Sequence, residues 1–183
     1  AEALEIKITG GTNNTIKGVA AVPDVSEAKP EVNLGNTAIT IKGTGAAAAT
    51  LEIGDATTPV ATNLSFKKLT VDTGTVSLNA EDAADSQNKT SVLVTELVVG
   101  DGKATTNDKA LVKLNKNTSL NANTLSITSG ASITVSGGAS LSAGEITINA
   151  GAVELGADGA ADNLGTLSST GKLDIKGGEV SVA

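Results

Sequence analysis

A short pattern of aliphatic residues recurs along the whole chain and constrains its fold more than any other feature. Two apolar residues separated by one residue are followed by a turn with Gly, and then by a second such pair. The full pattern, apolar-x-apolar-x-x-Gly-x-apolar-x-apolar, occupies residues 69–78, 146–155 and 173–182. Alternation with a period of 2 is typical of β-strands, and Gly or Asn between the pairs indicates turns. Looser copies begin at Ile6, Ile39, Leu97 and Leu125.

The first apolar residue of each copy serves as a marker of the repeat. Successive markers lie 21 to 33 residues apart. Repeats of this length are typical of solenoids, in which insertions change the turns while the strands keep their register. The markers are Ile6, Ile39, Leu69, Leu97, Leu125, Ile146 and Leu173.

Each repeat is predicted to contain three short strands. The first strand begins at the marker. The second is expected near Ile16 and at 51–53, 76–78, 111–114, 133–135, 153–155 and 180–182. The third contains an apolar residue five positions before the next marker, or six in the last repeat: Leu34, Leu64, Val92, Leu120, Leu141 and Leu167.

Composition agrees with a thin core that is repeated along an axis. The chain has no Cys, Met, Trp, Tyr, His or Arg, and Phe66, predicted to be a core residue, is its single aromatic residue. We therefore expect an all-β fold, a right-handed parallel β-helix of about seven coils forming one domain over residues 1–183, because crossovers between parallel strands are strongly right-handed. The alternative is an antiparallel β-sandwich, which also contains many short strands and turns.

The repeats from Leu4 to Val182 resemble the right-handed β-helices of bacterial surface and secreted proteins. These include autotransporter passenger domains, filamentous-haemagglutinin-like adhesins, and fibre or surface-layer subunits. The resemblance implies a secreted or cell-surface location and a structural or adhesive role without insertion into a membrane. An adhesin or passenger domain that binds a surface ligand is the alternative to a structural subunit.

Charge and side-chain chemistry exclude several functions. The net charge of −7 and the pI of about 4.5 argue against nucleic-acid binding, which requires a basic surface. β-Helices also include carbohydrate-active enzymes, but the lack of Arg and of aromatic platforms for sugars argues against that alternative. Without His or Cys, the common nucleophilic mechanisms are excluded. We expect no enzymatic activity.

Acidic turns are the candidate metal sites. Asp101 and Asp108 flank one turn, and Asp158 and Asp162 lie in another, where clustered oxygen ligands suit Ca²⁺. Neither turn has the spacing of an EF-hand, so solvated turns are the simpler interpretation. No other cofactor is expected.

The outward residues of the first strands are expected to form a column rich in Thr and Ser. Such a column resembles an ice-binding surface, but charged and apolar residues interrupt it, and Thr is common at exposed strand positions. The column consists of Lys7, Thr40, Thr70, Val98, Ser126, Thr147 and Asp174.

The first and last repeats lack an amphipathic segment that would cap them. Open solenoid ends invite strand pairing with another chain. We expect Leu4, Ile6 and Ile8 at one end and Val180 and Val182 at the other to mediate head-to-tail self-assembly into a filament. The alternative is that further coils of a longer adhesin cover these ends.

Overall fold

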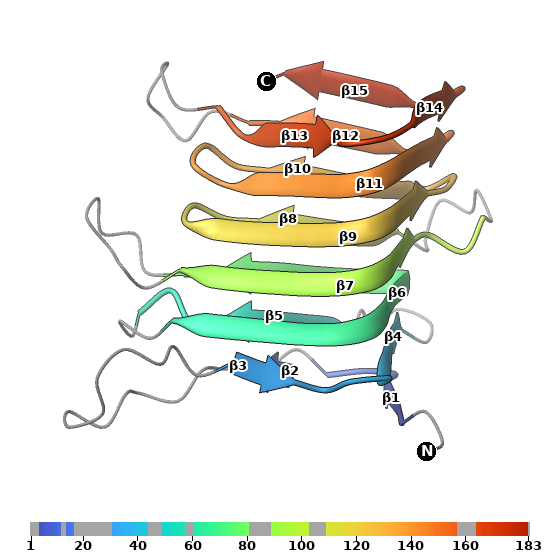
Figure 1. The fold of residues 1–183 in the computed structure, drawn as a ribbon. Coiled ribbons are helices and arrows are strands. Elements are labelled where there is room, and N and C mark those ends of the chain that lie inside the picture. The colour runs from blue at the N-terminus through green and yellow to red at the C-terminus, as the bar shows by residue number, and fades with distance from the viewer. Residues whose placement is uncertain are drawn as a thin grey trace.

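The computed structural model describes residues 4–11, 14–16, 31–43, 49–57, 61–80, 89–102, 109–156 and 164–182. Among these residues the regular elements are strands, and no helix that could span a membrane occurs. The strands join into a 15-stranded sheet whose pairs are parallel, and the sheet curls around one axis (Figure 1). The fold is that of a parallel β-solenoid, and the antiparallel sandwich is excluded.

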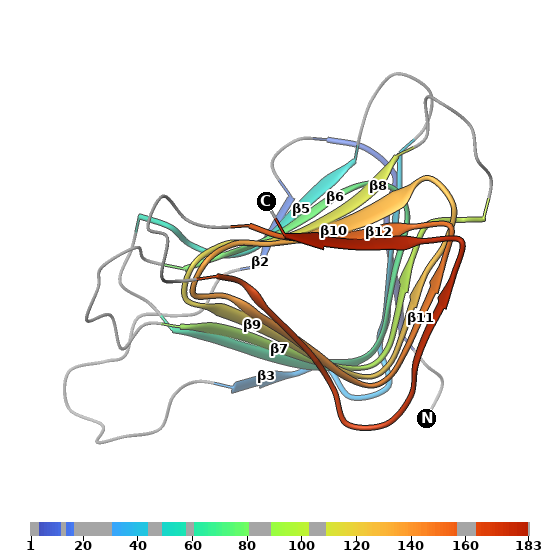
Figure 2. The ribbon, with the colours of Figure 1, turned by 90° about the horizontal axis from the view of Figure 1, so that it is seen from above.

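Seen along the axis, the sheet has three sides around an interior core (Figure 2). The first face carries the marker residues. Its strands, in order along the axis, are β1 (Glu5–Ile8), β4 (Ala38–Lys42), β6 (Thr62–Asn79), β7 (Thr90–Val99), β9 (Thr118–Ile127), β11 (Ser140–Asn149) and β14 (Leu173–Lys176).

The second face follows the first after one corner of each coil. Like the first face, it extends along the length of the stack. It contains the last part of β6, from Gly74 to Asn79, between β5 (Thr50–Gly54) and β8 (Ala110–Leu114). Its other strands are β2 (Asn14–Ile16), β5 (Thr50–Gly54), β8 (Ala110–Leu114), β10 (Ala131–Val135), β12 (Ala152–Leu155) and β15 (Glu179–Val182).

The third face precedes the first face in each repeat. It contains β3 (Glu31–Asn33), the first parts of β6, β7, β9 and β11, and β13 (Thr166–Ser169). The third and first strands of a repeat therefore form one continuous strand in β7, β9 and β11, and β6 continues through all three faces. The expectation of three separate short strands is wrong for these repeats, because the strand crosses the corner with a single residue left out of the pairing and resumes the same register beyond it.

The predicted marker ladder is confirmed. Each marker pairs with the next one, from Ile6 with Ile39 to Ile146 with Leu173. The markers from Ile39 to Ile146 are buried, together with inward-facing aliphatic residues of the other two faces, such as Leu64, Val76 and Leu120. Phe66 belongs to this core as predicted. Burial of like side chains in successive layers stabilises the stack, at about 1.5–3 kcal/mol for each fully buried Val, Leu or Ile.

Two register details differ from the prediction. On the third face Val32, not Leu34, pairs with Leu64. Leu34 begins a turn at residues 34–37, where β6 crosses the same corner with only residues 66–67. Because two extra residues preserve the period of 2, the sequence pattern cannot distinguish Val32 from Leu34. On the second face Val112 and Leu114 are buried, whereas Leu111 faces outward.

The corner between the first and second faces requires small residues. Gly74, at φ +116°, is such a residue, and a Cβ there would lie 2.2 Å from the backbone oxygen of Ala49. The neighbouring Thr75 amide donates to that same oxygen at 2.9 Å. Close contact between successive layers therefore explains the Gly of the repeat pattern. The same column contains Ala49, Ala110, Ala131, Gly151 and Gly178.

Candidate assembly surfaces

The layer at the C-terminal end of the stack leaves its inward apolar residues exposed. Strands β13, β14 and β15 pair with a neighbour on one side only among the described residues (Figure 1). Ile175 is 45% exposed, whereas Ile148, directly below it in the same column, is fully buried. Val182 is 64% exposed, and Leu173 and Val180 are also exposed. The layer therefore presents an aliphatic surface framed by unpaired strand edges.

The layer at the opposite end has the same character. In the part of the chain that the structure describes, β1, β2 and β3 each pair with one strand. Leu4 and Val32 are exposed. Ile6, Ile8 and Ile16 are half-buried and pack against the N-terminal end of the core. At both ends, apolar side chains thus continue the columns whose inner members are buried in the core.

The predicted end residues lie where the sequence places them. Leu4, Ile6 and Ile8 belong to the N-terminal layer, and Val180 and Val182 belong to the C-terminal layer. The prediction omitted Leu173 and Ile175 from this set, although both end the marker columns. Their position at the last marker was the signal that could have identified them.

Charged residues flank the apolar columns of the first face at both ends. Lys7 Nζ lies 3.3 Å from Glu5 Oε2 in the N-terminal layer. In the C-terminal layer Asp174 Oδ2 lies 2.9 Å from Lys172 Nζ and 3.1 Å from Lys176 Nζ. Hydrogen bonds from Lys172 and Lys176 lower the pKa of the Asp174 carboxyl, and the bond to Asp174 raises the pKa of Lys172. In the sequence pattern, Lys7 and Asp174 interrupt the column of Thr and Ser residues.

That outward column is assembled in the predicted register. Lys7 pairs with Thr40, and Thr147 pairs with Asp174 at the other end. Val98 and Ser126 are neighbours in its middle. The column is therefore a mixed polar and apolar surface with a charged residue at each end.

The calcium candidates are mostly outside the described residues. Asp108, Asp158 and Asp162 lie there, so the prediction stays untested at these positions. Asp101 is exposed in a corner where the Gly102 amide donates to Thr128 Oγ1 at 3.0 Å. Within the described ranges, no three acidic, His or Cys side chains come together as a metal site would require.

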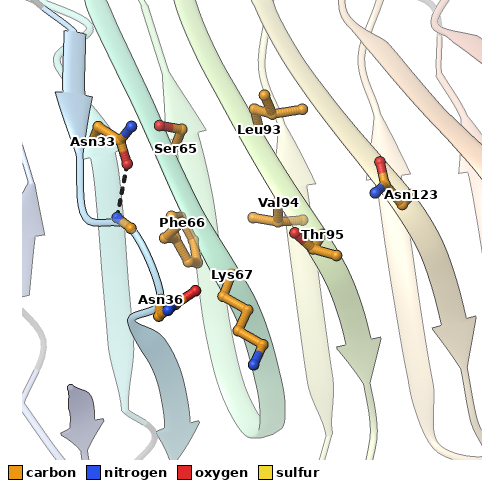
Figure 3. Close-up of a pocket in the computed structure, with 10 residues that line it drawn as sticks. Asn33, Asn36, Ser65, Phe66, Lys67, Leu93, Val94, Thr95 and Asn123 are labelled. Carbon is orange, nitrogen blue, oxygen red and sulfur yellow. Dashed lines mark hydrogen bonds between the residues drawn. The ribbon is translucent and has the colours of Figure 1, made fainter. Parts of the chain in front are cut away.

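A groove of about 340 Å³ lies on the third face, where the turn at 34–37 is longer than the corresponding part of β6 (Figure 3). Asn33 Oδ1 accepts a hydrogen bond from the Gly35 amide at 2.7 Å and shapes this turn. Leu93, 52% exposed, adds an apolar patch to the groove. The sequence did not predict it, because it arises from a difference in turn length. Its lining consists of Asn33, Gly35, Asn36, Ser65, Phe66, Lys67, Leu93, Val94, Thr95 and Asn123.

No protein-family model, no curated protein and no solved structure matches the chain. The function is therefore argued from the two end layers and the groove.

Proposed function

We propose that the protein is a structural subunit of an extracellular filament or surface layer, which assembles by head-to-tail stacking of its two end layers. The observation that carries this proposal is the exposure of aliphatic residues at both ends, together with strand edges that have no partner among the described residues. Exposed edges of parallel strands pair readily with another chain, and solenoids otherwise require capping repeats to remain soluble.

The two end layers are suited to each other because both continue the same columns. Stacked in the register of the solenoid, Ile6 and Ile8 of one copy would lie above Leu173 and Ile175 of another. On the third face this register would leave one layer open among the described residues between Leu167 and Val32, because β3 lies in the layer of β4, one layer further in than β1. The contact joins two different surfaces, so repetition of it generates an open filament unless the rotation closes a ring.

The proposal includes a right-handed winding with about seven coils. The hand is supported by the strong preference of parallel crossovers for right-handed connections. The coil number is supported by the ladder that runs from Ile6 to Leu173. A secreted or surface location follows from the resemblance to bacterial β-helices, and immunogold labelling of the intact source cells tests it.

Electron microscopy of the purified chain tests assembly directly. We expect filaments with the strands perpendicular to the long axis, and therefore a meridional reflection at about 4.8 Å. Replacing Ile175 and Val182 with Asp should abolish the filaments, because charges would then lie in the junction. Both residues are exposed, so the fold of the subunit should persist, as far-UV circular dichroism would show.

Leu93→Asp is the matched control, since Leu93 is also an exposed aliphatic residue but lies on the side wall. It should leave the filaments unchanged. Dispersed wild-type monomers at high concentration would contradict the proposal and favour further coils of a longer chain as the partner of these edges.

An adhesin that binds a surface ligand is the second candidate, and the groove on the third face favours it. The groove combines amide and hydroxyl groups with the exposed Leu93. Binding of labelled protein to candidate surfaces, with Leu93→Asp as the test variant, would assess it. Equal binding by the variant and the wild-type protein would exclude this groove as the binding site.

A further inference from the structure

Two outward columns of the first face flank the marker ladder and carry charges at its ends. One lies just before the markers and contains Glu5, Ala38, Lys68, Glu96, Thr124, Glu145 and Lys172. The other lies just after them and runs from Lys7 to Asp174. Because the columns run the length of the stack, their end residues decide which charges a stacked copy would meet.

Within the stack, the first of these columns already contains a charge pair between successive layers. Lys68 Nζ lies 2.8 Å from Glu96 Oε1, and the two residues are direct neighbours on adjacent parallel strands. The ladder geometry therefore places opposite charges in this column within bonding distance. A Lys and a Glu that met in this column at a junction could form the same contact.

The two end layers carry their charges in opposite order. The N-terminal layer has Glu5 before its marker and Lys7 after it. The C-terminal layer has Lys172 before its marker and Asp174 after it. We infer that copies of this chain stack with Ile6 of one copy over Leu173 of another, so that Glu5 meets Lys172 and Lys7 meets Asp174.

This inference rests on the proposed head-to-tail assembly and adds its register. Shifting the junction by two residues in one direction would place Asp174 opposite Glu5 and Lys176 opposite Lys7. The opposite shift would place Lys172 opposite Lys7. Like charges on facing strands are destabilising, so both shifts are disfavoured. A shift of one residue would place inward aliphatic residues of one copy opposite outward residues of the next.

Charge exchange at one end at a time tests this register without changing the net charge. One variant carries Glu5→Lys and Lys7→Glu, and the other carries Lys172→Glu and Asp174→Lys. Alone, each would place like charges at both positions of the junction. We expect the critical concentration for sedimentable filaments to rise about tenfold for each variant, because two attractive cross-strand pairs become repulsive.

An equimolar mixture of the two variants is the decisive arm. Each end of one variant then finds its complement on the other, so the critical concentration should return close to that of the wild type. A misfolded variant could not be rescued in this way. If instead two N-terminal ends formed the junction, Glu5 of one copy would pair with Lys7 of the other, and exchanging both residues would preserve this pair. The Glu5/Lys7 variant would then assemble normally.

The interior exchange Lys68→Glu with Glu96→Lys is the matched control. It preserves the pair within the stack and should leave assembly unchanged. The register would be overturned if the end-exchange variants assembled at the same critical concentration as the wild type, or if they stayed dispersed when mixed. Either result would leave head-to-tail assembly in place. Wild-type protein that forms no filaments would instead overturn the proposed function itself.

Discussion

The hydroxyl group of Thr90 donates a hydrogen bond to the backbone carbonyl of Asn79, eleven residues earlier in the chain, at 2.5 Å. Thr118 makes the equivalent bond to Asn115 at 2.6 Å. The two threonines are buried neighbours on adjacent strands, and the Asn115 amide donates to Asn79 Oδ1 at 2.6 Å. A polar ladder thus closes the corner between the second and third faces of an otherwise aliphatic core.

Replacing Thr118 with Val removes this hydroxyl donor while keeping the side-chain shape. The carbonyl of Asn115 then loses a partner in a buried corner, and we expect the free energy of unfolding to fall by about 1–3 kcal/mol. Chemical denaturation followed by far-UV circular dichroism measures it, since the chain lacks Trp and Tyr. Thr134→Val, at an outward position of β10, should change stability by less than about 0.5 kcal/mol. Equal effects of the two substitutions would contradict the role of the corner bond.

Gly74→Ala should destabilise the protein through backbone strain and a steric clash. The new Cβ would approach the Ala49 carbonyl oxygen at a φ that L residues rarely adopt. We expect a loss of about 2 kcal/mol or more in the free energy of unfolding. Gly177→Ala is the control, because Gly177 has φ +66° but no atom within 4 Å of the new Cβ. Its cost should be limited to about 1–2 kcal/mol for the left-handed backbone, and a cost as large as that of Gly74→Ala would argue against the clash.

Ile148 and Ile175 provide a comparison of one residue type in one column. Ile148 is fully buried, and Ile175, its neighbour in the last layer, is 45% exposed. In dispersed protein, Ile148→Ala should lower the free energy of unfolding by about 2–5 kcal/mol because it leaves a cavity. Ile175→Ala should have a much smaller effect under the same denaturation conditions. Similar losses would mean that the last layer is covered in the isolated subunit.

The carboxyl of Asp174 should titrate below its ordinary range in dispersed protein, because Lys172 and Lys176 stabilise its charged form through hydrogen bonds. A pKa that is lower in the folded state than in the unfolded state means that these bonds contribute stability above the unfolded pKa. The contribution is lost as the pH falls through the folded pKa. NMR titration of the Asp174 carboxyl carbon measures the shift.

Lys172→Gln and Lys176→Gln, made as separate variants, should each return the Asp174 pKa toward its ordinary value. Lys42→Gln, on a distant strand, should leave it unchanged. If all three variants gave the same Asp174 pKa as the wild type, the two lysines would not be the cause of its shift.

Most of the core could be predicted from the sequence because parallel stacking repeats one arrangement in every layer. A strand with a buried face must alternate with a period of 2, so Ile39, Leu69, Leu97 and Leu125 identified one column from their spacing alone. The end residues Leu4 and Val182 followed from the same pattern.

Only the tertiary structure decided what depends on the length and course of the turns. An insertion of two residues preserves the alternation, so the choice between Val32 and Leu34 required the pairing with β6. The adjacent apolar residues Leu111 and Val112 posed the same problem on the second face. The groove beside Leu93 and the opposite charge order of the two ends emerged once each residue had a place in a column. The local pattern determines which residues face inward, but strand pairing between distant segments determines which residues meet.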